Sequence, residues 1–137
     1  MLRLRALVAT FFPELRLFGL PAEFYVGSKW LALFAEPSLP SGHVFLLWDL
    51  VIFYGSVQPV YGEAMLLSMA GVLFQEAAAK DSLPNSAHEL KWLVDNPLIL
   101  ELRLMRLPGF SDALLSLFLR LFPSGLISSF FSDAVNF

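Results

Sequence analysis

The sequence FLLWDLVIFYG, residues 45–55, is almost entirely apolar but carries an aspartate directly after a tryptophan. Asp49 is the only charged residue between Glu36 and Glu63. The stretch lacks the apolar–polar alternation of a half-exposed strand and is long enough for a buried helix. It therefore predicts a helix with one carboxylate among its apolar side chains, and a carboxylate buried there needs a structural or chemical role.

Proline and glycine residues divide the rest of the chain into segments that also have the composition of helices. Pro13 ends the first of them, and Pro37 and Pro40 force a loop before the stretch quoted above. The predicted helices cover residues 2–12, 21–36, 42–54, 58–80, 86–96, 98–107 and 112–122, and a last apolar stretch covers residues 125–137. No strand alternation and no internal repeat occurs, so the predicted fold class is all-α, an irregular array of several helices.

Single residues predict how the second and third helices are built. Ser41 is the expected N-cap of the helix over 42–54, and Gly55 is placed like a residue that ends a helix in the left-handed conformation. In the helix over 21–36, one face is expected to carry Phe24, Gly27, Trp30, Leu31 and Phe34.

The long fourth helix combines large apolar residues with small ones, and small residues inside a helix often mark a close contact with another helix. The large residues are Met65, Met69, Val72 and Phe74, and the small ones are Gly62, Ala64, Ala70 and Gly71.

Ser86 and Glu89 form a capping box, in which each side chain satisfies a backbone N–H at the helix start. Further along, Pro108 and Gly109 predict a break, after which Ser111 is expected to cap the last helix.

The composition is unusually apolar for a chain of 137 residues. Hydrophobic residues make up 57% and charged residues 15% of the sequence, whereas soluble domains carry about 25% charged residues. This excess must face either lipid or protein outside the chain. The longest run without a charge is thirteen residues, 50–62, and a membrane-spanning helix needs about 20 apolar residues. A spanning helix is therefore disfavoured.

The N-terminal sequence MLRLRALVATFF resembles a secretory signal, but its apolar part is only seven residues long, which favours an amphipathic first helix instead. The absence of cysteine excludes disulfides and fits a cytoplasmic location. The net charge of −3 and the lack of a Lys/Arg cluster argue against binding to nucleic acid.

Residues with catalytic or metal-binding potential are few. His43 and His88 are far apart in the sequence, and neither has a carboxylate at ligand spacing on its own helix face, so both are expected to be surface or capping residues. No nucleophile elbow and no Gly-rich phosphate loop is present. The sequence therefore predicts no catalytic residue, no cofactor and no metal site.

An ordered set of short motifs resembles the C-terminal half of a TBC domain, the helical domain that activates the GTPase activity of Rab proteins. The resemblance covers about residues 10–95, which would form a TBC-like C-terminal subdomain, with residues 96–137 as additional C-terminal helices. The matching residues are Pro13, Glu14, Leu15, Phe24, Tyr25, Trp30, Leu31, Phe34, Leu39, Pro40, Leu47, Trp48, Asp49, Leu50 and Gly55. The chain departs from the pattern between Leu15 and Trp30, where it is about three residues shorter and has Phe18-Gly19 in place of a frequent His-Leu pair.

The resemblance implies that six of these residues are structural: Pro13, Trp30, Phe34, Trp48, Asp49 and Gly55. Trp48 would lie in the core. Asp49 would be a structural polar residue that accepts hydrogen bonds from backbone N–H groups or from an arginine, because an unpaired buried charge is strongly destabilising.

The same resemblance implies a Rab-type small GTPase as the partner, and peripheral association with endomembranes through it. The catalytic arginine and glutamine of the family belong to the motifs I-x-x-D-x-x-R and Y-x-Q of the N-terminal half. None of Arg16, Arg103, Arg106 and Arg120 has an aspartate three residues before it, and neither Gln58 nor Gln75 follows a tyrosine at the required spacing. The chain is therefore expected not to accelerate GTP hydrolysis on its own.

The apolar excess would then be the surface that packs against the missing N-terminal half, since an obligate interface resembles a core cut in two. Two alternatives remain open from the sequence. In the first alternative, the chain is a non-catalytic module that binds a small GTPase or another helical partner. In the second, it is an unrelated helical protein that lies on or in a membrane.

Overall fold

The computed structural model describes residues 2–36, 39–79, 83–96 and 107–121. All regular structure within these ranges is helical, which confirms the predicted all-α class. The helices are α1 (Leu2–Phe11), α2 (Ala22–Leu31), α3 (Ser41–Val57), α4 (Pro59–Ala78), α5 (Ala87–Asp95) and α7 (Leu107–Leu121). The apolar stretch over 125–137, and the helix predicted over 98–107 apart from its last residue, lie outside the described residues.

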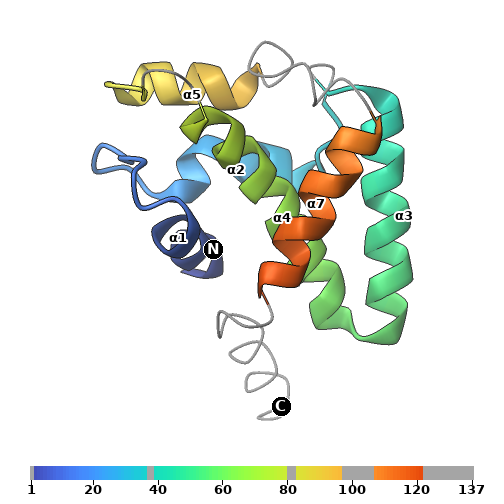
Figure 1. The fold of residues 1–137 in the computed structure, drawn as a ribbon. Helices are drawn as coiled ribbons and strands as arrows, with labels where there is room; N and C mark the ends of the chain where they lie inside the picture. Colours follow the sequence, from blue (N-terminus) through green and yellow to red (C-terminus); the bar gives the residue numbers. More distant parts are fainter. Residues whose placement is uncertain (1, 37–38, 80–82, 97–106, 122–137) are drawn as a thin grey trace.

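Helix α4 is the centre of the fold. It contacts each of the other described helices, with α3 and α1 beside it, α7 across it, and α2 and α5 toward its C-terminal half (Figure 1). Large and small residues along it are buried on all sides, as expected of a helix that is apolar all round. The large residues Met65, Met69, Val72 and Phe74 are all buried.

Helices α3 and α4 form an antiparallel hairpin in which Gln58 is the only connecting residue. Gly55 and Gly62 face each other across it: a Cβ at Gly62 would lie 3.4 Å from the Gly55 Cα and 3.4 Å from the backbone oxygen of Val51. The small-residue prediction is thus confirmed at Gly62. The prediction that Gly55 ends α3 in the left-handed conformation is wrong, because the helix continues to Val57 and Gly55 permits the close approach instead.

Helix α7 packs across α4, and its boundaries differ from the prediction. It begins at Leu107, so Pro108 lies in its first turn, where a proline's missing N–H removes no hydrogen bond. The predicted break at Pro108-Gly109 and the cap at Ser111 are therefore wrong. A Cβ at Gly71 of α4 would lie 3.1 Å from the Leu117 side chain, so a second small residue of α4 marks a close helix contact.

The start of α3 also differs from the prediction. The N-cap is Pro40 and makes no side-chain cap hydrogen bond, while Ser41 is the first helical residue. The capping box of α5 is present in part. Ser86 accepts a hydrogen bond from the Glu89 N–H at 3.1 Å, and the Glu89 carboxylate accepts one from the N–H of Asn85 at 3.4 Å, one residue before the predicted donor.

Helix α2 ends five residues earlier than predicted, in a Schellman motif. The N–H of Phe34 donates to the Lys29 carbonyl at 2.7 Å, and the N–H of Leu33 donates to the Trp30 carbonyl at 3.0 Å. Leu33 has φ 52° and Phe34 has φ 62°, a left-handed conformation that costs a non-glycine residue about 1–2 kcal/mol. Complete burial of the Phe34 ring stabilises this strained turn.

The buried face of α2 is not the predicted one. Phe24 and Leu31 are exposed, and the residues that α2 buries are Ala22, Tyr25, Val26 and Lys29. The buried Tyr25 donates its hydroxyl hydrogen to the Leu17 carbonyl at 2.9 Å, just before a turn in which Phe18 and Gly19 both have positive φ. This turn occupies the segment that is shorter than in the TBC pattern.

Ion pairs connect helices that are distant in the sequence. Arg3 of α1 binds both carboxylate oxygens of Glu63 in α4, at 2.8 and 2.9 Å. Arg5 of α1 binds Glu23 of α2 at 2.6 Å. These bridges link α1 to α4 and α2.

The buried Lys29 is the centre of a second network. Its Nζ lies 2.8 Å from Glu36 Oε2 and 2.8 Å from Asp95 Oδ1, and Lys91 binds the same Asp95 oxygen at 2.9 Å. Burial alone would lower the pKa of Lys29, but the hydrogen bonds and charges of Asp95 and Glu36 outweigh it and raise that pKa. Burial likewise opposes ionisation of Asp95, yet the two lysines hold its pKa below the usual value. These ion pairs therefore connect α2, the loop after it and α5.

Candidate functional site

The outer face of α3 is the candidate functional site. We define the α3 stripe as the residues that follow this face at helical spacing: Phe45, Trp48, Asp49, Ile52, Phe53 and Val57. Phe45, Ile52, Phe53 and Val57 are 58%, 70%, 62% and 68% exposed. Helix α3 turns Val44 and Leu47 into the core, so apolar residues occupy both of its faces and only the inner set is covered.

Trp48 is half-buried at the edge of the stripe, and its ring is fixed. The indole Nε1–H donates to the Leu33 carbonyl at 2.8 Å, and the ring meets Phe45 edge-on with centroids 5.9 Å apart. Because Leu33 lies in the strained turn after α2, the same hydrogen bond ties that turn to α3. The expected core position of Trp48 is thus only partly right.

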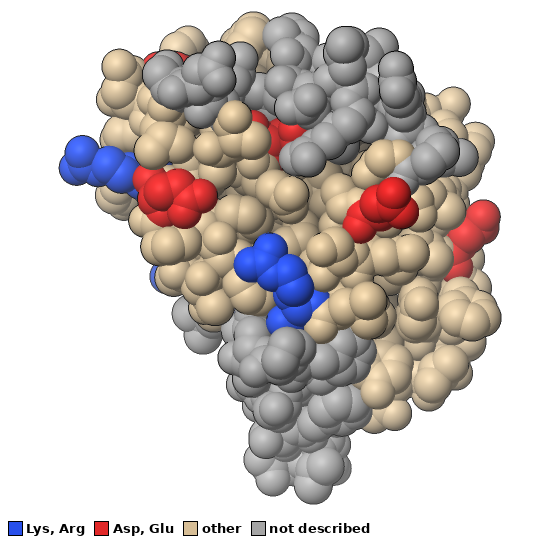
Figure 2. Space-filling model, viewed as in Figure 1, with Lys and Arg blue, Asp and Glu red and all other residues tan. Residues whose placement is uncertain are grey.

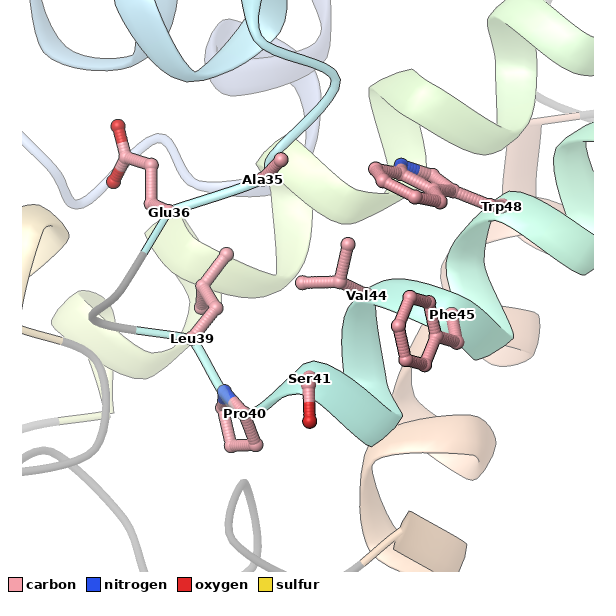
Figure 3. Close-up of a pocket in the computed structure, with 8 residues that line it drawn as sticks. All are labelled: Ala35, Glu36, Leu39, Pro40, Ser41, Val44, Phe45 and Trp48. Atoms are coloured by element: carbon pink, nitrogen blue, oxygen red, sulfur yellow. The ribbon is translucent and has the colours of Figure 1, made fainter.

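A hollow of about 610 Å³ lies on one side of Trp48. It is bounded by the segment that leads from α2 to α3 and by the first turns of α3. In Figure 3 the side chains of Leu39 and Val44 point toward each other at its floor, Phe45 and Trp48 stand on the α3 side, and the Glu36 carboxylate points away. That carboxylate is bound to Lys29, so the groups that face the hollow are mainly apolar.

A second, smaller hollow of about 250 Å³ lies on the other side of Trp48. Its lining is wholly apolar and comes from the turn after α2, from α3 and from α4: Leu33, Trp48, Val51, Ile52 and Leu66. The indole of Trp48 therefore separates a larger hollow of mixed polarity from a smaller, wholly apolar one beside the α3 stripe.

Charge near the α3 stripe is sparse. Figure 2 shows wide tan surface with few charged side chains on the side of the molecule that it displays, including the end of the α3–α4 hairpin. Within the stripe, Asp49 carries the only charge and is exposed. Its carboxylate has no hydrogen-bond or ion-pair partner among the described residues. The expectation that Asp49 is buried and accepts structural hydrogen bonds is therefore wrong.

The other residues of the TBC pattern lie in several parts of the fold. Pro13 is exposed in the turn after α1, and Gly55 lies at the α3–α4 contact. Trp30 and Phe34 bring their rings together at 6.4 Å around the end of α2. The structure thus gathers Trp30, Phe34 and Trp48 near one turn and separates Pro13 and Gly55 from them.

The two histidines have different environments. His88 is exposed, as expected, but His43 is buried under α7, with its ring 4.4 Å from that of Phe110. The expectation of a surface or capping residue is wrong for His43, because α7 covers the start of α3. No group of three or more His, Asp or Glu residues in the described ranges is arranged to hold a metal ion.

The described arginines have structural contacts. Arg3 and Arg5 bind carboxylates, as given above, and the guanidinium of Arg120 lies 4.5 Å from the centre of the Phe11 ring. Arg16 is exposed and lies 6.0 Å from the Phe18 ring, while Arg103 and Arg106 lie outside the described residues.

Sequence reasoning missed two residues that shape this region. Leu33 lines the smaller hollow and accepts the Trp48 hydrogen bond, and no sequence signal marks a leucine for a left-handed position that glycine usually occupies. Lys29 lies on the same face of α2 as Ala22, Tyr25 and Val26. The helical spacing of the four residues could have indicated this buried face, but a lysine is rarely buried unless it is paired.

No helix in the described ranges is both long and apolar enough to cross a membrane. In comparisons with known proteins, no family model matches this chain, and neither does a curated protein or a solved structure. The TBC resemblance and the function that it implies therefore stay predictions.

Proposed function

We propose that this chain is a helical docking module, the C-terminal half of a TBC-type domain, which binds a helical protein surface through the α3 stripe and does not itself accelerate GTP hydrolysis. The observation that carries the proposal is the exposure of Phe45, Ile52, Phe53 and Val57 along one face of α3. Monomeric proteins rarely expose contiguous apolar patches beyond a few hundred Å², and larger ones mark interaction sites.

The form of the surface supports a protein partner. Phe45 and Ile52 project from the α3 stripe, and a hollow lies on each side of Trp48, the smaller of which is wholly apolar. The cores of protein interfaces are enriched in aromatic residues and in the pockets that receive them. In the TBC interpretation, the helical surface belongs to the missing N-terminal half of the domain or to a Rab-type GTPase. Peripheral association with endomembranes would follow from binding such a GTPase.

The lack of catalysis is proposed on chemical grounds. Stimulated GTP hydrolysis needs a cation beside the γ-phosphate and a group that orients the attacking water. The chain lacks both family motifs, and Arg3, Arg5 and Arg120 are held by contacts within the fold. Binding without contacts to the transition state does not accelerate the reaction.

The docking surface is tested with an apolar dye and two matched variants. Ile52→Glu places a charge in the α3 stripe, and Leu119→Glu places one at a similarly exposed position of α7. We expect the native chain to bind anilinonaphthalene sulfonate and to self-associate in sedimentation velocity, and Ile52→Glu to reduce both effects more than Leu119→Glu. Equal effects of the two variants, or a native chain that is monomeric and dye-free, would contradict docking through α3.

The absence of catalysis is tested by single-turnover GTP hydrolysis across a panel of Rab GTPases, with the chain in excess. We expect each GTPase to retain its own rate. Stimulation of one of them, abolished by substitution of Arg16, Arg103, Arg106 or Arg120, would show that a substitute arginine finger exists.

A further inference from the structure

We infer that the α3 stripe selects an amphipathic helix that carries an arginine or lysine opposite Asp49. The inference rests on the proposed docking function and adds the chemistry of the partner. The observation behind it is the carboxylate of Asp49, which lies between Trp48 and Ile52 in an otherwise apolar stripe. This carboxylate is exposed and has no partner in the described ranges.

The dimensions of the stripe fit a partner helix of a few turns. From Phe45 to Val57 the rise of about 1.5 Å per residue gives a length of about 18 Å. A helix laid along this stripe would present apolar residues every three or four positions and could insert side chains into the depressions on either side of Trp48. Asp49 lies about a third of the way along this length from Phe45, so a partner that covers the stripe also covers the carboxylate.

A covered carboxylate must be compensated, because a buried unpaired charge is strongly unfavourable. The described part of the chain supplies no cation for it: Arg3 and Arg5 bind Glu63 and Glu23, Lys29 and Lys91 bind Asp95, and the guanidinium groups of Arg16 and Arg120 lie near the rings of Phe18 and Phe11. Helix α3 itself contains no lysine or arginine. Within the described ranges no lysine or arginine is placed to compensate Asp49, so we assign that role to a cation of the partner.

Two other occupants match the charge less well. A second copy of the α3 stripe would bring a second Asp49 and no cation, so self-association through the stripe is expected to be weaker than binding of a basic helix. Binding to a lipid surface would bring Asp49 close to the apolar phase of the membrane, where a charged carboxylate is energetically unfavourable. Anionic lipids would also repel a chain of net charge −3. A basic amphipathic helix satisfies both the apolar residues and the carboxylate.

The test uses three fluorescein-labelled helical peptides of about 18 residues, long enough to form helix in isolation. They share one leucine pattern and differ at a single position on the apolar face, which holds arginine, glutamine or glutamate. Fluorescence anisotropy gives the affinity of each for the native chain and for Asp49→Lys and Asp49→Asn. Asp112→Lys is the matched control, because Asp112 is exposed on α7 and the change in net charge is the same.

We expect the arginine peptide to bind the native chain about tenfold more tightly than the glutamate peptide, as paired and opposed charges at an interface predict. Asp49→Lys should reverse this order, Asp49→Asn should nearly abolish the difference, and Asp112→Lys should leave it unchanged. The arginine preference should also shrink at high salt, because the partly exposed pair is screened.

The two proposals fail in different ways. If all three peptides bind equally and Ile52→Glu weakens them equally, docking through α3 stands and the selection of a basic helix is overturned. If no peptide binds, the selection is also overturned, and the dye and sedimentation measurements on Ile52→Glu and Leu119→Glu decide whether α3 docks a partner at all. Circular dichroism of each variant verifies that it is folded.

Discussion

Replacement of Lys29 by methionine tests whether the buried ion network stabilises the fold. The Lys29 side chain is 3% exposed and binds Glu36 and Asp95 at 2.8 Å each. Methionine keeps the apolar stem packed but removes the charge, so the two carboxylates lose their shared partner. Removing one partner of a buried ion pair costs about 3–5 kcal/mol.

The expected loss for Lys29→Met is smaller than that range for two reasons. The side chains of Glu36 and Asp95 remain 23% and 38% exposed, so water can solvate them, and Asp95 retains its pair with Lys91 at 2.9 Å. We therefore expect a loss of about 2 kcal/mol in the free energy of unfolding. For a domain of this size that corresponds to a decrease of roughly 6–8 °C in Tm.

Urea denaturation followed by circular dichroism at pH 7 measures the difference. Arg5→Met is the matched control, because the Arg5–Glu23 pair is solvent-exposed and exposed pairs contribute little. A Lys29→Met variant as stable as the native chain would show that desolvation of the charges cancels their attraction and would refute the reasoning.

The pH dependence gives a second measure of the same network. The pKa of Asp95 is depressed, so its contribution is present above about pH 4 and is lost as the pH falls through the folded-state pKa. The pKa of Lys29 is raised, so its contribution is present below about pH 10 and is lost as the pH rises through its folded-state pKa. The difference in unfolding free energy between the native chain and Lys29→Met should therefore be constant at neutral pH and should narrow as the pH falls below about 4. A difference that does not narrow at all in acid would assign the loss to packing.

Three further substitutions have expected effects on thermal or urea unfolding. Gly27→Ala should stabilise by about 0.5–1 kcal/mol, because alanine favours helix and the new methyl meets only the Glu23 Cβ at 3.8 Å; a loss would reveal an unrecognised clash. Ser86→Ala should cost about 1 kcal/mol by removing the α5 cap, and an unchanged midpoint would mean that water replaces it. Gly62→Leu should cost at least about 2 kcal/mol, because its side chain meets the backbone of Gly55 and Val51; Gly42→Leu, in open space, is the control and should have little effect.

The sequence predicted the parts of the fold that depend on local or all-round signals. Helix α4 was predictable because it is apolar on every side, and the α5 cap because Ser86 and Glu89 are three residues apart. The role of Gly55 was predicted wrongly, because the sequence does not distinguish a glycine that ends a helix from one that allows a second helix to approach closely. Only the position of Gly62 opposite Gly55 shows the second role. The α2 face was missed because burial of Lys29 depends on Asp95, 66 residues away.

The candidate site was predictable in composition but not in orientation. The apolar excess indicated an uncovered surface, and the run from Phe45 to Gly55 contains all of the α3 stripe except Val57. Because that run is apolar all round, periodicity could not say which residues face the core, and the acidic residue was placed inside when it lies outside. Only the packing of α4 and α7 against α3, which leaves Val44 and Leu47 buried, decides which residues face the core.

The single-residue connection between α3 and α4 has a consequence for the order of folding. Gln58 places the two helices side by side at almost no cost in loop entropy, whereas α1 and α7 reach α4 through contacts between residues far apart in the chain. We therefore expect the α3–α4 hairpin to belong to the folding nucleus. Substitutions at the Gly55–Gly62 contact should then slow refolding, while those at Leu117 of α7 should mainly speed unfolding.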